Sequence, residues 1–259
     1  MLGRITGRAA AVNRHVDRHP AAVYTLAMAK SAGARPHEAL SQSIEDYLKA
    51  VYELTRGEGR ASTNALAEFL DIAPASVTGM LQKLAATKPP LLEYQKHHGA
   101  RLTVEGEKVA LETIRHHRLL ELFLHQMLGY EWDQVHDEAD RLEHVISEQF
   151  EQRIAEALGD PRLDPHGDPI PRTDLTLPDS SSVLLSSLRP GQRARVVRVR
   201  DTAPDLLRHL SLQGVVPQAE LTITSYSEFD GNLHLKVGGG KKESVFGPRV
   251  TNQVYVEAI

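Results

Sequence analysis

The sequence predicts a mainly α-helical protein that ends in a small β-rich domain. Three observations support this fold class. Apolar residues recur at helical spacing in several segments between residues 43 and 158. Five short segments with the composition of β-strands follow after residue 195. A stretch rich in proline and serine, residues 161–188, separates the two regions and is expected to form loops.

The composition is that of an ordinary globular protein, with 259 residues, 41% hydrophobic and 25% charged side chains. No apolar run approaches the roughly 18 residues of a membrane span, and we find no signal-peptide pattern. We therefore expect a cytoplasmic protein without a membrane partner. Cysteine does not occur, which excludes disulfides and thiolate metal sites, so any metal ion must be held by histidine, carboxylate or carbonyl groups.

Charge is distributed unevenly along the chain. Residues 1–37 carry six basic side chains and one acidic side chain, a net charge of +5. Residues 130–160 carry ten acidic and two basic side chains, a net charge of −8. This asymmetry predicts an anionic partner at one end of the chain and bound cations in its middle. The basic arm either contacts a DNA backbone or stays disordered.

The first predicted helix runs from Ser43 to Leu54. Ser43 and Asp46 have the spacing of a capping box, which would give Asp46 a purely structural role. Gly57 and Gly59 are expected to end the helix.

Two short helices joined by a tight turn follow, over residues 63–70 and 74–84, and Pro74 suits the first position of the second helix. This pattern predicts a helix-turn-helix, with an ordinary helical hairpin as the alternative. Small and hydroxyl side chains at the start of a recognition helix can approach phosphates and thymine methyl groups. The candidate DNA-contacting residues of this helix are Ala75, Ser76, Thr78, Gly79, Gln82 and Lys83.

A β-hairpin with a basic tip is predicted directly after these helices. Its strands are residues 91–95 and 100–103, and Lys96 lies at its tip. A hairpin in this position is a wing, so the pattern favours a winged helix-turn-helix that binds double-stranded DNA, with Lys96 and Arg101 at phosphates.

A long, largely apolar helix is predicted from Glu105 to Leu128. His117 and Glu121 lie four residues apart on one of its faces. Polar groups inside an apolar helix need partners, so the two residues form either a hydrogen-bonded core pair or part of a metal site. The apolar surface of this helix also suits a dimer interface.

Residues 135–158 read as one further helix. Its apolar side, with Leu142, Val145 and Ile146, would face the core. Four potential metal ligands share one face of this helix: His136, Asp140, Glu143 and His144. Two imidazoles and two carboxylates on one face can bind a divalent metal ion, and a solvated acidic face is the alternative.

Asp164 and His166 lie in a proline-fixed loop that ends at Pro171. Residues 173–188 are polar and serine-rich, as expected of a linker. Five strands and a helical turn that begins at Asp205 predict a small five-stranded barrel, an accessory module by its size. The strands are residues 196–200, 220–226, 234–238, 242–246 and 253–259.

Four motifs stand in this order along the chain: E-D-Y-L at 45–48, H-R-L-x-E at 117–121, V-H-D-E-A-x-R-x-E-H at 135–144 and P-H-G-D-P-I-P at 165–171. With them, residues 41–171 resemble the diphtheria-toxin-repressor family of metal-dependent transcription regulators, and the tail is similar to the family's SH3-like or FeoA-like module. The resemblance implies a homodimer and five parts: a basic extension (1–38), a winged helix-turn-helix (39–109), a dimerisation and metal-binding domain (110–172), a linker (173–188) and an SH3-like barrel (189–259).

The resemblance also implies two metal sites. The family's primary site maps to Asp46, Asp140, Glu143 and His144. Its ancillary site maps to His117, Glu121 and His136 in the pattern of iron-dependent members. In the pattern of some manganese-dependent members it maps to Asp164, His166 and Asp205. The two ancillary patterns overlap at Glu121, and the sequence leaves open which histidines are used.

Iron-type members have Met and Cys where this chain has Asp46 and Asp140, whereas manganese-type members have acids there. Oxygen ligands with one imidazole suit the harder Mn²⁺, although Fe²⁺ and other divalent transition metals remain candidates. Lys49 stands where a subset of manganese members has a further acid, which argues against the paired-metal site of that subset.

The resemblance therefore predicts a regulator, and most simply a repressor, in which metal fixes the DNA-binding domain against the dimer core. Two other functions compete with it. One is a winged-helix regulator that senses a small organic ligand. The other is a metal-dependent hydrolase, for which the sequence offers no separate catalytic group, so we expect neither enzymatic activity nor a small-molecule substrate.

Overall fold

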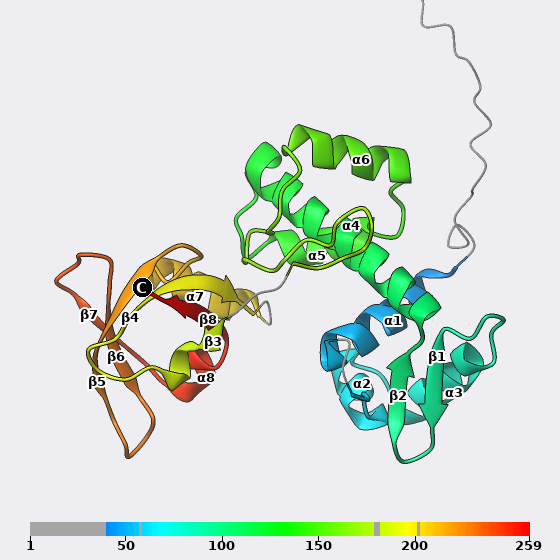
Figure 1. The fold of residues 1–259 in the computed structure, drawn as a ribbon, viewed down its shortest axis with the longest axis horizontal. Coiled ribbons are helices and arrows are strands. Elements are labelled where there is room, and N and C mark those ends of the chain that lie inside the picture. The colour runs from blue at the N-terminus through cyan, green and yellow to red at the C-terminus, as the bar shows by residue number, and fades with distance from the viewer. Residues whose placement is uncertain (1–39, 57–58, 179–181, 201–202) are drawn as a thin grey trace, which may run out of the picture. The chain divides into compact units, whose positions relative to one another are not determined.

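The computed structural model describes residues 40–56, 59–178, 182–200 and 203–259 (Figure 1). The basic arm, residues 1–37, and Gly57 lie outside these ranges, so the expectations that concern them rest on sequence alone. Within the described residues, three apolar cores form: one under the first three helices and the hairpin, one along the middle helices, and one inside the C-terminal sheet.

The first core belongs to a winged helix-turn-helix, which confirms this part of the predicted fold. Its elements are α1 (Gln42–Thr55), α2 (Thr63–Phe69), α3 (Pro74–Ala85), β1 (Leu92–Gln95) and β2 (Gly99–Leu102). The Ser62 side chain accepts from the backbone N–H of Ala65 and begins α2, while Pro74 occupies the first turn of α3. The strands β1 and β2 pair antiparallel.

The ends of α1 differ from the prediction. Helical geometry begins before Ser43, so this residue lies inside the helix and the capping box with Asp46 is wrong. At the other end, Arg56 in the left-handed region (φ 49°) terminates the helix. Because the Asp46 carboxylate caps nothing, it is available for contacts outside α1.

The long helix α4 (Val104–Leu128) is the element on which α1, α5 (Val135–Leu142) and α6 (Glu148–Ala157) pack, and Figure 1 shows it in green. Thr103 caps its start by accepting the Gly106 N–H at 3.2 Å. Gly129, at φ 74°, ends it in the left-handed region.

The single helix predicted over residues 135–158 is wrong, because the chain turns between α5 and α6. Ser147 accepts the Phe150 N–H at 3.3 Å and starts a new helix there. Glu143 and His144 consequently lie in the turn that follows α5. Val145, expected in the core, is 74% exposed.

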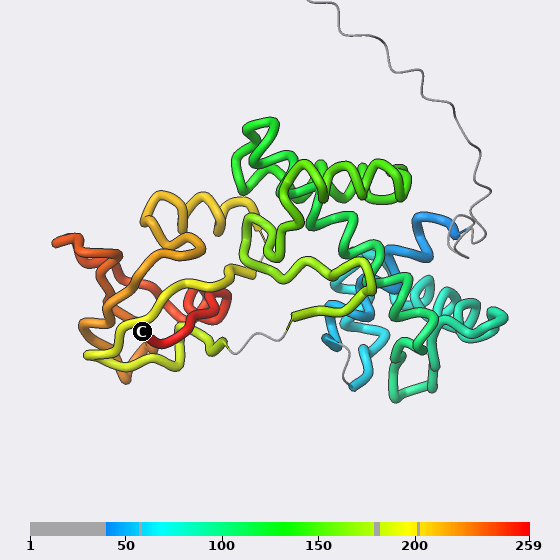
Figure 2. Tube along the Cα trace, turned by 45° about the horizontal axis from the view of Figure 1, so that its top comes forward, coloured from blue at the N-terminus to red at the C-terminus, as the bar shows by residue number. Residues whose placement is uncertain are grey.

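The C-terminal region, coloured yellow to red in Figure 2, contains an antiparallel sheet. Its strand order is β3-β8-β4-β5-β6-β7. It has one strand more than predicted, because residues 183–184, expected in the linker, pair with β8. The end strands β3 and β7 do not pair with each other within the described part of the chain, so the predicted barrel is open. Its elements are β3 (Val183–Leu184), β4 (Arg193–Val199), α7 (Pro204–Gln213), β5 (Glu220–Tyr226), β6 (Leu233–Val237), β7 (Glu243–Phe246), α8 (Pro248–Thr251) and β8 (Val254–Ala258).

The proline-fixed loop lies directly against β4. The backbone N–H of Val199 donates to the carbonyl of His166 at 2.9 Å. The Asp168 carboxylate pairs with Arg198 of β4 at 3.0 Å. Gly167, at φ 89°, approaches so closely that an added Cβ would lie 2.0 Å from the Val197 carbonyl oxygen.

Replacing Gly167 with alanine is therefore expected to separate the loop from β4. Urea unfolding should show a loss of about 1–3 kcal/mol from overpacking, and the Val199 amide should exchange faster with solvent. Gly129→Ala is the matched control, since Gly129 has a similar φ of 74° but no atom within 4 Å of an added Cβ. Equal losses in both variants would show that backbone strain alone, and not the contact, matters at Gly167.

Candidate metal centre and DNA-binding surface

Three potential ligands from distant parts of the chain meet beside α1. The His144 Nε2 atom lies 2.9 Å from the Asp46 carboxylate and 3.3 Å from that of Glu143. One ligand atom of each residue falls within 4.8 Å of the other two. We call Asp46, Glu143 and His144 the primary group. Asp46 comes from the DNA-binding domain, and the other two come from the turn after α5.

Glu45 orients the imidazole of this group. Its carboxylate lies 2.5 Å from His144 Nδ1, so Nδ1–H donates to Glu45 and Nε2 faces Asp46 and Glu143. A carboxylate behind a histidine ligand fixes its tautomer and raises its basicity, as is typical of metal sites. Glu45 belongs to the E-D-Y-L motif but has no predicted role, and its place next to Asp46 is the only signal for one in the sequence.

The primary group holds a proton in the metal-free protein. Burial alone would lower the pKa of His144, but hydrogen bonds to the carboxylates of Asp46 and Glu45 outweigh burial and raise this pKa from 6.5 to about 9. A cation that binds Nε2 must therefore displace this proton near neutral pH.

Mn²⁺ affinity of the primary group is accordingly expected to rise with pH, by up to about tenfold per unit between pH 6.5 and 9. The contribution of protonated His144 to metal-free stability has the opposite sign: it is complete below pH 6.5 and lost as pH rises through about 9. Titration calorimetry in buffers of different ionisation enthalpy would measure the released proton. In Glu45→Gln the rise of Mn²⁺ affinity with pH should level off at a lower pH. A Mn²⁺ affinity that stays the same from pH 6.5 to 9 would contradict the assignment.

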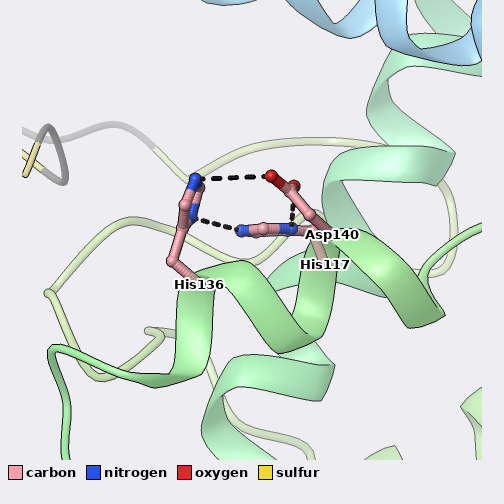
Figure 3. Close-up of side chains that lie close together, drawn as sticks. All are labelled: His117, His136 and Asp140. Atoms are coloured by element: carbon pink, nitrogen blue, oxygen red, sulfur yellow. Dashed lines mark hydrogen bonds and ion pairs between the residues drawn. The ribbon is translucent and has the colours of Figure 1, made fainter.

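A second group lies on α4 and α5, with His117, His136 and Asp140 pointing toward one another (Figure 3). His117 Nε2 is 3.0 Å from His136 Nδ1, and His117 Nδ1 is 3.2 Å from the Asp140 carboxylate. His136 Nε2 lies 3.6 Å from the same carboxylate. Asp140, expected among the primary ligands, is thus grouped with two residues expected in the ancillary site.

Lys49 lies between the two groups and contacts Glu143 of the primary group. The Glu143 carboxylate, only 2% exposed, is 2.6 Å from His117 Nδ1 and 2.8 Å from the Lys49 ammonium. Burial alone would raise the pKa of Glu143, but His117 and Lys49 hold it below its usual range. For Asp140 the same pair likewise outweighs burial and keeps the pKa low.

A third group, Glu121, Asp164 and His166, is entirely buried. Glu121 joins it to the second group, because its carboxylate is 2.9 Å from His117 Nε2 and 3.8 Å from His166 Nδ1. Both ancillary patterns therefore meet at Glu121. The Asp205 side chain lies apart from this group: it is 93% exposed and pairs with Arg208.

The three groups fit a hard divalent cation by their chemistry, because carboxylates and imidazoles supply all their donor atoms. The third group has a buried cation beside it, because Arg118 Nε lies 3.7 Å from the Asp164 carboxylate. Burial and the neighbouring carboxylates of Glu121 and Asp168 raise the pKa of Asp164 well above its usual range. A further cluster of His116, Glu148 and Glu151 contains a cation as well, since Arg115 binds Glu151 at 2.6 Å.

The predicted recognition helix presents its candidate residues as expected. All of them are exposed except Thr78, which is half-buried and donates to the Pro74 carbonyl at 3.0 Å. A groove of about 570 Å³ runs between this helix and the wing. Asn64, Tyr94 and His97 also line this groove, although they are not among the predicted DNA-contacting residues.

The two basic side chains of the wing differ: Lys96 has no ion pair among the described residues, whereas Arg101 is already paired. Lys96 is exposed and lines the groove. Arg101 instead binds Glu93 through two hydrogen bonds of 2.8 and 3.0 Å across the hairpin. A phosphate would have to compete with this carboxylate, which weakens the expectation for Arg101.

None of the helices in the described ranges has the length and apolar character needed to cross a membrane. Three family models match consecutive parts of the chain. Residues 39–100 match "Iron dependent repressor, N-terminal DNA binding domain", residues 103–172 match "Iron dependent repressor, metal binding and dimerisation domain", and residues 183–258 match "FeoA domain".

Similar proteins carry related descriptions. The iron-dependent repressor IdeR of Mycobacterium leprae is 34% identical over 198 residues, which cover 71% of this chain and 84% of the relative. The regulator MntR of Oceanobacillus iheyensis is 38% identical over 116 residues, 45% of this chain and 77% of the relative.

Solved structures agree with these relatives. A manganese-dependent transcriptional repressor in complex with manganese has a TM-score of 0.78 at 33% identity, and the match covers 83% of this chain and all of that one. ScaR with bound Zn²⁺ has a TM-score of 0.71 at 33% identity, over 83% and 99% of the two chains. The chain belongs to the diphtheria-toxin-repressor family of metal-dependent transcription regulators.

Proposed function

We propose that this protein is a cytoplasmic repressor that binds an operator as a homodimer and is activated by Mn²⁺. One observation carries the proposal: the three residues of the primary group come from two different domains. Asp46 belongs to α1 of the DNA-binding domain, whereas Glu143 and His144 follow α5 of the dimerisation domain. A cation held by all three joins the two domains.

The residues of the primary group would act as follows. Without a cation, the carboxylates of Asp46 and Glu143 repel each other, and the His144 proton and the Lys49 ammonium, 2.8 Å from Glu143, offset part of their charge. A bound divalent cation supplies the positive charge that removes this repulsion. Asp46 then fixes α1, whose buried Leu48 and Val51 connect it to the core beneath the recognition helix. The DNA-competent arrangement is favoured to the extent that it binds the cation more tightly.

Mn²⁺ is the proposed physiological metal because the primary group offers two carboxylates and one imidazole and no sulfur. Fe²⁺ is the alternative, with other divalent transition metals able to bind in vitro. The second and third groups are proposed as an ancillary site that uses Glu121 with either His117 and His136, or Asp164 and His166. Both sets line one cavity of about 340 Å³.

The homodimer is proposed to form through apolar side chains that the single chain leaves exposed. Met127 is 54% exposed, Val145 74% and Phe150 47%. They lie at the end of α4 and around the turn between α5 and α6. A symmetric dimer would place two recognition helices in successive major grooves, about 34–36 Å apart.

A metal titration of DNA affinity tests the proposal. The probe is a duplex selected from a random library by the Mn²⁺-loaded protein, and Mn²⁺, Fe²⁺ and Zn²⁺ are compared by fluorescence anisotropy. Equal DNA affinity with and without each metal would contradict the proposal. Metal analysis of the purified protein separates it from a regulator that senses an organic ligand, which would hold no metal.

Asp140→Cys tests whether Asp140, which lies in the second group, is a metal ligand that contributes to the preference for Mn²⁺. A thiolate favours softer ions, so we expect this variant to respond less to Mn²⁺ relative to Fe²⁺ and Zn²⁺ than the unmodified protein does. The measurement is the metal concentration at half-maximal DNA binding for each ion. An unchanged ranking would argue against Asp140 as a ligand.

A further inference from the structure

Lys49 places a positive charge inside the ligand cluster. It follows Asp46 by one turn of α1, and its side chain is only 16% exposed. The ammonium lies 2.8 Å from the Asp140 carboxylate and 2.8 and 3.0 Å from the two oxygens of Glu143. His117 Nδ1 is 3.1 Å away.

These contacts are the ones expected around a bound metal cation. The ammonium touches two carboxylates and one imidazole, and each of these residues belongs to one of the groups described above as potential metal ligands. An exposed ion pair would share its charge with water and with one acid, whereas the half-buried Lys49 side chain brings its ammonium against three polar side chains from α4, α5 and the turn after α5. The two carboxylates, each within 3.0 Å of the ammonium, offset the cost of removing its charge from water.

We propose that Lys49 is a tethered cation that occupies the position of a second metal ion between Glu143 and Asp140. The primary group then binds a single ion beside Lys49, and Lys49 sets this number. Glu143 carries the argument, because one of its oxygens faces His144 and the other faces His117, with Lys49 within 3.0 Å of both. This inference rests on the metal-binding role proposed above.

Lys49 occupies the carboxylates that two neighbouring metal ions would have to share. Two divalent ions about 3.5–4 Å apart repel each other strongly, and shared anionic ligands offset this repulsion. Here Asp140 and Glu143 are the carboxylates that could bridge, and both already bind the ammonium. A second divalent ion could enter only if Lys49 left.

The test counts Mn²⁺ ions on the full chain by equilibrium dialysis and detects neighbouring ions by electron paramagnetic resonance. Two Mn²⁺ ions that share a bridging carboxylate give a spin-coupled spectrum, whereas isolated ions do not. We expect no spin-coupled pair in the unmodified protein. Lys49→Glu, which replaces the cation with a ligand, should bind about one further Mn²⁺ per chain and show coupling.

Two further variants make the result decisive. Lys49→Gln removes the charge without adding one, and it should bind the additional ion at higher Mn²⁺ concentrations. It decides the question if Lys49→Glu fails to fold. Lys108→Gln is the matched control, because Lys108 is an exposed lysine of α4 that pairs only with Glu105 among the described contacts. It should bind the same number of ions as the unmodified protein.

Two outcomes would overturn the inference: a spin-coupled pair in the unmodified protein, or no additional ion in folded Lys49→Glu and Lys49→Gln. The failure of the proposed function has a different signature. In that case the unmodified protein binds no Mn²⁺ at the primary group, and His144→Ala changes neither the number of ions nor their affinity.

Discussion

His144→Ala is expected to abolish the dependence of DNA binding on Mn²⁺. The substitution removes the only imidazole of the primary group, and with it the contact that links Asp46 to the turn after α5. Couplings between two binding sites typically change affinity about 5- to 150-fold. We expect the increase that Mn²⁺ causes to fall below about 2-fold in the variant. Anisotropy titrations of the selected duplex at several Mn²⁺ concentrations would measure it.

Metal-free DNA affinity is the internal reference for this experiment, and it should change little. His209→Ala is the control substitution, because His209 is an exposed histidine on α7 that contacts Phe246. This variant should respond to Mn²⁺ like the unmodified protein. If His144→Ala kept the full response, the Asp46–Glu143–His144 group would not be the activating site.

Gly106→Ala is expected to destabilise the winged-helix domain by about 3 kcal/mol, the upper part of the range for overpacking. A Cβ at this position would lie 1.8 Å from the Leu91 carbonyl oxygen. The same oxygen accepts the Thr103 N–H at 3.1 Å, so the backbone cannot move without breaking this hydrogen bond. Urea unfolding followed by circular dichroism would measure the loss.

Gly79→Ala is the matched control, since it makes the same substitution in a helix where no atom lies within 4 Å of the added Cβ. Alanine is the better helix former, and we expect this variant to gain about 0.5–1 kcal/mol. If Gly106→Ala were no less stable than the unmodified protein, the start of α4 could move away from Leu91.

Local sequence patterns were sufficient to predict most of the elements. The helix-turn-helix and wing follow from apolar spacing, from Pro74 and from a short basic turn, all of which act within a few residues. The same holds for most strands of the C-terminal sheet. The break between α5 and α6 was missed because residues 135–158 keep a helical pattern of apolar residues through the turn. Ser147 was the one local signal of a new helix start.

The arrangement of the site depends on distances that no local pattern contains. Helical spacing placed His136, Asp140, Glu143 and His144 on one face, but the turn after α5 divides them between two groups. The role of Glu45 depends on a contact with His144, which is 99 residues away. The position of Lys49 depends on residues more than 60 positions away on α4, on α5 and in the turn after α5.

The turn that holds Glu143 and His144 affects how fast the protein responds to metal. Ligands in the middle of a helix separate only when helical hydrogen bonds break, whereas these two residues follow the last residue of α5. Loop motions take nanoseconds to microseconds. We therefore expect the departure of the cation to be limited by its bonds to the ligands and not by unwinding of a helix. Such a sensor would follow a fall in metal concentration with little delay.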